Sequence, residues 1–151
     1  MKVVLIDTGP IVAYLNGRDR HHAWAVERFQ QLRPPLITCE AVLSEAVFLL
    51  RSAPGGGDRV MDLMRRGVLA VSFALQEESA AVSALLRRYR SLPMDLADAC
   101  LVRMSEQHAD CLLLTVDSEF RDIYRRNGRQ VIPTLLPPGS RGRPRTASSR
   151  A

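Results

Sequence analysis

The sequence predicts a single α/β domain in which a parallel sheet is sandwiched by helices. Short apolar segments alternate with amphipathic helical segments along the chain, and strands that alternate with helices usually form a parallel sheet. Two apolar segments, residues 2–6 and 111–115, are runs typical of strands buried on both faces. Right-handed crossovers would place the carboxyl ends of all strands at one edge of the sheet.

The strands are expected where brief apolar segments lie between turns or helices. The first ends abruptly at Asp7, and the turn Thr8-Gly9-Pro10 follows. Proline in this position is compatible with the first turn of a helix. The expected strands are residues 2–6, 36–38, 69–73, 111–115 and 130–132.

The expected helices carry apolar residues at helical spacing and are bounded by glycine or proline. Gly17 ends the first helix and Pro34 follows the second. Glu45 lies inside the third, among apolar residues, where a carboxylate is rarely buried unless it is paired or bound to a cation. The expected helices are residues 11–16, 21–32, 40–51, 58–66, 76–90, 95–108 and 118–126.

The helix expected at residues 76–90 has charges at both ends. Glu77 and Glu78 would lie in its first turn, and Arg87, Arg88 and Arg90 in its last. This distribution complements the helix dipole.

The basic charge lies mainly at the C-terminal end. The chain of 151 residues has 21 Lys and Arg against 16 Asp and Glu, a net charge of +5. No acid follows Asp122, and residues 137–151 contain four arginines without a hydrophobic pattern. We therefore expect a folded domain at residues 1–136 and a disordered Arg-rich tail at 137–151. Such a tail either binds RNA phosphates or serves only as a solubilising end.

Composition excludes several classes of protein. No apolar run approaches the ~20 residues of a membrane span, and the N-terminus lacks the layout of a signal peptide. Because Lys2 is the only lysine, sites that depend on a later lysine, such as phosphate-binding loops, are excluded. Cys39, Cys100 and Cys111 form no C-x-x-C pair and have apolar neighbours. We interpret them as buried, reduced thiols and predict a cytoplasmic protein.

Two positions have competing interpretations. Asp7 is either a cap of the helix that follows it or a residue of a functional site at the sheet edge. His21 and His22 are adjacent, so a helix would direct them to different faces. We therefore interpret the two histidines as polar residues at a helix start rather than as metal ligands.

Several acids are expected to converge at the carboxyl edge of the sheet. Asp7 and Asp117 each follow an apolar strand, and Asp95 and Asp98 share one face near the start of a helix. Glu45 comes from another apolar helix. Clustered carboxylates repel one another, and Mg²⁺ or Mn²⁺ with oxygen ligands removes that conflict. A water held by such an ion near a phosphodiester is a suitable nucleophile.

Four short motifs resemble those of a known family, the PIN-domain ribonucleases, and within it the toxins of VapBC-type toxin–antitoxin pairs. The similarity extends from about Val3 to Pro133. The motifs are I-D-T-G at residues 6–9, L-S-E-A at 43–46, L-A-D-A at 96–99 and T-V-D-S-E-F at 115–120.

The resemblance implies a fold, a reaction and partners. The implied fold is a five-stranded parallel sheet in a three-layer α/β/α arrangement. The implied activity is that of a metal-dependent endoribonuclease with Asp7, Glu45, Asp98 and Asp117 as its acids. Thr8 and Thr115 match positions that support these acids by hydrogen bonding. RNA is the implied substrate, and the implied protein partners are a second copy of the chain and a small antitoxin.

Other interpretations are less consistent with the residues. A receiver domain needs a late lysine, and a phosphatase-like domain usually has Asp-x-Asp where this chain has Asp7-Thr8-Gly9. The remaining alternative is a non-catalytic PIN-like module that binds RNA or protein. We prefer the nuclease, because a pure scaffold has no use for a cluster of repelling acids. Asp95 fits a supporting role, since an acid in the first turn complements the helix dipole, whereas Asp98 is the acid of the motif.

Overall fold

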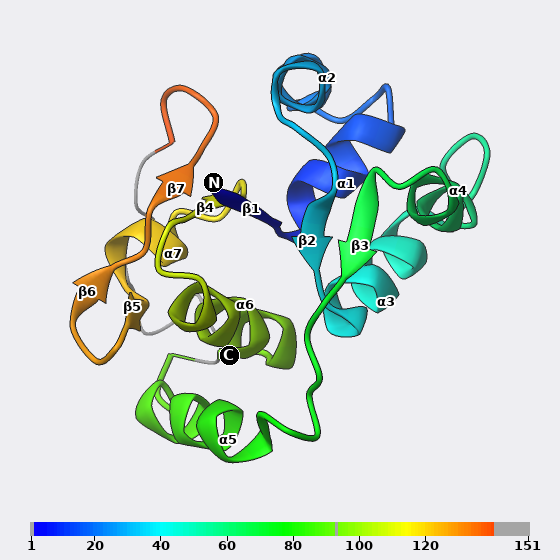
Figure 1. Cartoon of the computed structure of the whole chain (residues 1–151). Helices are drawn as coiled ribbons and strands as arrows, with labels where there is room; N and C mark the ends of the chain where they lie inside the picture. Colours follow the sequence, from blue (N-terminus) through cyan, green and yellow to red (C-terminus); the bar gives the residue numbers. More distant parts are fainter. Residues whose placement is uncertain (1, 93, 141–151) are drawn as a thin grey trace.

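The computed structural model describes residues 2–92 and 94–140, which form a parallel sheet flanked by helices (Figure 1). The sheet has five strands in the order β3-β2-β1-β4-β7, and every neighbouring pair is parallel. This arrangement confirms the predicted α/β class and the five-stranded parallel sheet. The strands are β1 Val3–Ile6, β2 Leu36–Thr38, β3 Leu69–Val71, β4 Cys111–Leu114 and β7 Thr134–Leu135.

The central strands β1 and β4 are in register along their whole length. Val3 pairs with Cys111 and Ile6 with Leu114, and Leu5, Ile6, Leu113 and Leu114 are fully buried. From β1 the sheet grows in one direction through β2 and β3, and in the other through β4 and β7. The direction of the strand order therefore changes between β1 and β4. Open α/β sheets bind ligands at such a topological switch point, beyond the carboxyl ends of the strands.

The helices connect the strands. Helix α6 contacts β1 and β4, and α5 packs on α6, while α1 contacts α2, α3 and α4. Helix α1 begins at Thr8, earlier than expected, because Pro10 fits the first turn, where its missing N–H would be unpaired anyway. The helices are α1 Thr8–Leu15, α2 His22–Gln31, α3 Glu40–Leu49, α4 Arg59–Arg65, α5 Ser79–Arg88, α6 Leu96–Gln107 and α7 Glu119–Asp122.

The prediction of a final sheet strand at residues 130–132 is wrong. Gln130–Val131 is strand β6, which pairs antiparallel with β5, Arg125–Arg126, outside the central sheet (Figure 1). Residues 127–129 join the two strands, and Asn127 and Gly128 have positive φ of 52° and 83°, a conformation that Asn and Gly adopt readily in hairpin turns. The chain then passes Pro133, and β7 completes the sheet.

Two predicted helices are too long. The segment 118–126 contains only the short helix α7, because its second half belongs to the hairpin. The segment 76–90 becomes helical only at Ser79, so Glu77 and Glu78 are not in a first helical turn. Glu78 instead forms an ion pair with Arg103 on α6 (3.1 Å).

Three further expectations concern the thiols, the tail and membranes. The prediction of buried, unpaired cysteines is confirmed for Cys39, Cys100 and Cys111. Of the predicted tail, residues 141–151 lie outside the described residues, whereas Pro137 is buried and accepts a hydrogen bond from the Ser140 amide. No helix of the described chain has both the length and the apolar character needed to cross a membrane.

Candidate active site

An acidic cavity of about 330 Å³ opens at the carboxyl edge of β1 and β4. Six carboxylates contribute to its wall, and among residues 2–92 and 94–140 no lysine or arginine does. The five acids singled out in the sequence are all among them, although they come from separate parts of the chain. The acids that line the cavity are Asp7, Asp19, Glu45, Asp95, Asp98 and Asp117.

Asp7 is the one buried residue among these six acids, with 8% of its surface exposed. It follows β1 directly and caps α1, so the two interpretations of this residue describe one position. Its carboxylate accepts hydrogen bonds from the Thr8 amide (2.7 Å) and the Thr115 hydroxyl (2.8 Å). Burial nevertheless raises the pKa of Asp7 to about 7, and the charges of Asp117 and Glu45 act in the same direction.

Two threonines connect the acids. The buried Thr115 hydroxyl donates to Asp7 and accepts from the Asp117 amide (3.0 Å), so one side chain positions both strand-end acids. The Thr8 hydroxyl donates to Glu45 (3.2 Å), which lies on α3. Glu45 is exposed as a whole residue, and the partial burial of its carboxylate raises its pKa, with a further contribution from the charge of Asp95.

Asp95 and Asp98 form a reciprocal cap at the start of α6. Asp95 is the cap residue itself, one position before the helix, and its carboxylate accepts from the Asp98 amide (2.7 Å). Asp98 in turn accepts from the Asp95 amide (3.3 Å). This capping box satisfies amides that the first helical turn leaves unpaired. Burial raises the pKa of Asp98 to about 8, and the charges of Asp95 and Asp7 add to the effect.

The structure adds residues to the site that the sequence pattern did not single out. Asp19 and His21, from the connection between α1 and α2, line the cavity. His21 was expected only as a helix-start residue, and it does immediately precede α2. The Tyr124 hydroxyl lies 3.0 Å from Glu119 and 3.4 Å from Asp98. Glu119 belongs to the T-V-D-S-E-F motif, but no local pattern distinguishes Tyr124.

Gly9 allows the start of α1 to lie close to the segment that follows β4. A Cβ atom at Gly9 would lie only 2.3 Å from a methyl carbon of Val116. Val116 stands between Thr115 and Asp117, so the absence of a side chain lets the start of α1 pack against the end of β4. This contact keeps the carboxyl ends of the two central strands close together.

The donor set suits a hard divalent cation. Apart from His21, the polar side chains of the wall are carboxylates and the Thr8 hydroxyl, and Mg²⁺ and Mn²⁺ prefer such oxygen ligands. Asp7 is buried, and the described part of the chain supplies no lysine or arginine to the cavity wall, so a bound cation would relieve the cost of its charge. Within the described chain, no three His, Cys, Asp or Glu side chains are already arranged to hold a metal directly. A cation that keeps several waters, as Mg²⁺ usually does, is compatible with this spacing.

The metal-free protein is expected to lose stability as pH rises from about 5 to about 8.5. Asp7 and Asp98 have folded-state pKa values of about 7 and about 8, well above the ordinary 3.8. The folded state therefore binds these protons more tightly, and that stabilisation disappears as pH rises through the folded pKa values. Each group contributes a slope of at most roughly 1.4 kcal/mol per pH unit.

Thermal melting of the metal-free protein across this pH range measures the effect. Asp98→Asn should flatten the dependence and raise the melting temperature at the alkaline end, because it removes one of the two groups. A melting temperature that increases with pH, or an unchanged slope in the variant, would contradict the assignment.

Comparison with known proteins gives a family match and a structural match. A family model described as PIN domain matches residues 4–126. VapC20 of Mycobacterium tuberculosis, described as a sarcin–ricin loop cleaving toxin, has a similar structure with a TM-score of 0.69. The alignment covers 77% of this chain and 91% of that one, with 17% identical residues, so the likeness is one of fold. Comparison with curated protein sequences gives no match.

Proposed function

This chain belongs to the PIN domain family, and from that premise we propose that it is a Mg²⁺- or Mn²⁺-dependent endoribonuclease, the toxin of a toxin–antitoxin pair. The observation that carries the proposal is the convergence of Asp7, Glu45, Asp98 and Asp117 on one cavity. The fold shared with VapC20, an RNA-cleaving toxin by its description, supports the choice of RNA as substrate.

In the proposed reaction, some residues of the cavity hold the cation and others hold those residues in place. Asp7, Asp98 and Asp117, with Glu45, would hold the cation, which when bound supplies an activated water and stabilises charge on the phosphate. Thr115 fixes the orientation of Asp7 and Asp117, and Thr8 fixes that of Glu45. The capping box holds Asp98 at the first turn of α6. Such preorganisation lets the carboxylates act without rearrangement.

The direct test is cleavage of RNA with and without the cation. Purified protein should cleave single-stranded RNA internally when Mg²⁺ or Mn²⁺ is present, and chelation should stop cleavage until the cation is restored. The alternative, a non-catalytic module, predicts RNA or protein binding without cleavage under any of these conditions. Products mapped on total cellular RNA would identify the cleaved sequence.

Thr115→Val is expected to lower the cleavage rate roughly 10–100-fold, the usual effect of losing a group that orients a metal ligand. Valine keeps the shape of this fully buried side chain but removes the donor to Asp7 and the acceptor for the Asp117 amide. Thr115→Ser keeps the hydroxyl and should stay within a few-fold of the wild-type rate. Rates measured over a Mg²⁺ titration test this role, and a valine variant with wild-type kinetics would refute it.

The proposed protein partners are a small antitoxin and a second copy of the chain. The α3 residues Val47, Phe48 and Leu49 have exposed apolar side chains, and Leu49 contributes to the cavity wall. An antitoxin that covers this surface could direct an Arg or Lys into the acids, where a charge-assisted pair would form. A structure of the complex in which no basic side chain reaches Asp7 or Asp98 would contradict this mode. Sedimentation of the isolated protein tests the homodimer.

A further inference from the structure

Exposed arginines gather where the end of α5 meets the β5–β6 hairpin. Arg87, Arg88 and Arg90 come from the end of α5, and Arg129 from the hairpin; all four are exposed. The Arg88 guanidinium donates to the Gly128 carbonyl, and the Tyr89 hydroxyl accepts from the Arg125 amide (2.9 Å), so the two segments are in contact. We call Arg87, Arg88, Arg90 and Arg129 the arginine patch.

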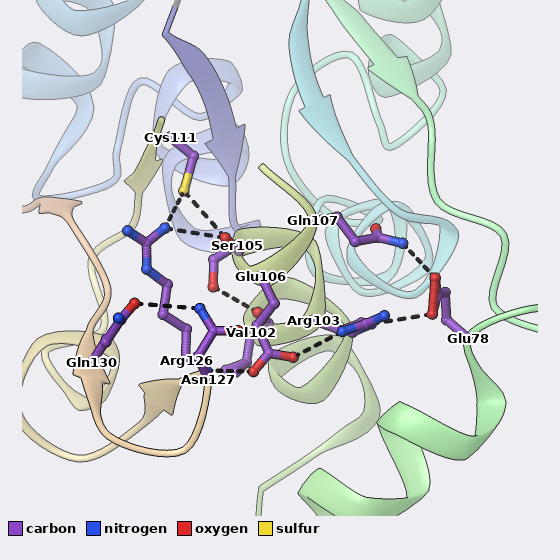
Figure 2. A network of polar contacts seen from close by, with 10 residues as sticks. All are labelled: Glu78, Val102, Arg103, Ser105, Glu106, Gln107, Cys111, Arg126, Asn127 and Gln130. Carbon is purple, nitrogen blue, oxygen red and sulfur yellow. Dashed lines mark hydrogen bonds and ion pairs between the residues drawn. The ribbon is translucent and has the colours of Figure 1, made fainter. Parts of the chain in front are cut away.

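The charge of the arginine patch is not neutralised within the described chain. None of its members forms an ion pair with a described carboxylate. Glu106, which accepts a hydrogen bond from the Asn127 amide of the hairpin, is already paired with Arg103 (3.3 Å), and Figure 2 shows that Arg103 also pairs with Glu78 at the start of α5 (3.1 Å). Positive potential therefore remains available for an external anion.

The hairpin that carries Arg129 is firmly anchored. The Arg126 guanidinium points back toward the end of α6 and donates to the carbonyls of Ser105 (3.1 Å) and Ala109 (3.3 Å). The Asn127 amide donates to Glu106 (2.6 Å), and Figure 2 shows the contacts of Arg126 with Ser105 and of Asn127 with Glu106 on the C-terminal part of α6. A rigidly presented charge pays less ordering entropy on binding than one on a mobile loop.

The arginine patch is connected to the acidic cavity by two aromatic rings. Tyr89, between Arg88 and Arg90, packs edge-on against Tyr124 with ring centroids 5.2 Å apart. The Tyr124 hydroxyl reaches Asp98, 3.4 Å away. In the sequence, Arg90 precedes the cavity residue Asp95 by a short connection. The end of α5, which carries the patch residues Arg87 and Arg88, is therefore linked through Tyr89 and Tyr124 to the cavity acid Asp98 at the start of α6.

A cavity with six carboxylates repels a polyanion, so affinity for RNA must come from another surface. Arginine binds phosphate through its planar set of donors. We propose that the arginine patch binds phosphates of the RNA segment next to the cleaved bond, while the acidic cavity receives the bond itself. This assignment rests on the proposed ribonuclease function. It places the RNA next to the cleaved bond across the end of α5 and the β5–β6 hairpin.

The test compares two triple variants in the full chain carrying Asp7→Asn, so that binding is measured without cleavage. One variant is Arg87→Gln/Arg90→Gln/Arg129→Gln, which keeps the Arg88 contact with the hairpin. The control, Arg33→Gln/Arg65→Gln/Arg66→Gln, removes the same charge from exposed positions that do not line the cavity. The probe is a fluorescent single-stranded RNA, titrated in Mg²⁺ at several salt concentrations, and melting curves confirm that both variants fold.

The patch variant should raise the Kd for RNA at least roughly tenfold and reduce the slope of log Kd against log salt by about 2, near 0.7 for each lost phosphate contact. The control should change the Kd less than about twofold. With Asp7 intact, the patch variant should raise KM and leave kcat nearly unchanged. If the two triple variants have equal effects, or if the Kd of the patch variant is unchanged, the proposal is wrong. The arginine patch would then be better explained as a binding site for an acidic protein surface. Failure of the wild-type protein to cleave any RNA would instead count against the proposed function.

Discussion

Asp7→Asn is expected to abolish Mg²⁺-dependent RNA cleavage while the fold is retained. Asp7 is the buried acid at the switch point, held by the Thr8 amide and the Thr115 hydroxyl. Asparagine has nearly the same shape but no negative charge, and its single carbonyl oxygen is a poor substitute for a carboxylate toward Mg²⁺. Changing a residue that only orients a ligand costs roughly 10–100-fold, so loss of a ligand should exceed a hundredfold.

The matched control for this variant is Asp110→Asn. Asp110 is exposed and directly precedes β4, at the opposite edge of the sheet, and its substitution removes the same charge. It should cleave RNA at nearly the wild-type rate. Circular dichroism and Mg²⁺ titration calorimetry would separate a loss of metal binding from a loss of fold. Cleavage by Asp7→Asn at the wild-type rate would remove Asp7 from the mechanism.

Asp98→Asn is expected to eliminate Mg²⁺-dependent cleavage, whereas Asp95→Asn should retain activity within about tenfold of wild type. The two acids belong to one capping box but face different electrostatic conditions. Burial raises the pKa of Asp98 to about 8, so its charge is costly in the absence of a cation. Asp95 accepts the Asp98 amide as the helix cap, and asparagine caps helices about as well as aspartate.

Stability and activity measured together distinguish the two positions. Asp95→Asn should change the free energy of unfolding by no more than a few tenths of a kcal/mol. Asp95→Ala, which removes the cap, should cost about 0.5–2 kcal/mol. An inactive Asp95→Asn protein beside an active Asp98→Asn protein would reverse the assignment of the two acids.

The sequence by itself determined the α/β class, the two central strands and the places where these strands end. Residues 2–6 and 111–115 are short apolar runs typical of buried strands, and the acid that follows each lies at the same edge because the strands are parallel. Helix and strand periodicity are local properties, so the motif acids could be assigned to strand ends and helix starts from residue order alone.

Tertiary structure decided which edge strand joins the sheet and which side chains complete the cavity. Strands β6 and β7 are each two residues long, too short to show an alternation of apolar and polar residues. The turn with Asn127 and Gly128 determines the place of β6, and pairing with β4 determines that of β7. Asp19 and Tyr124 reach the site from segments without a motif, and Thr115 joins Asp7 to Asp117 across two strands. These contacts depend on distances between segments far apart in the chain, and local sequence patterns do not encode such distances.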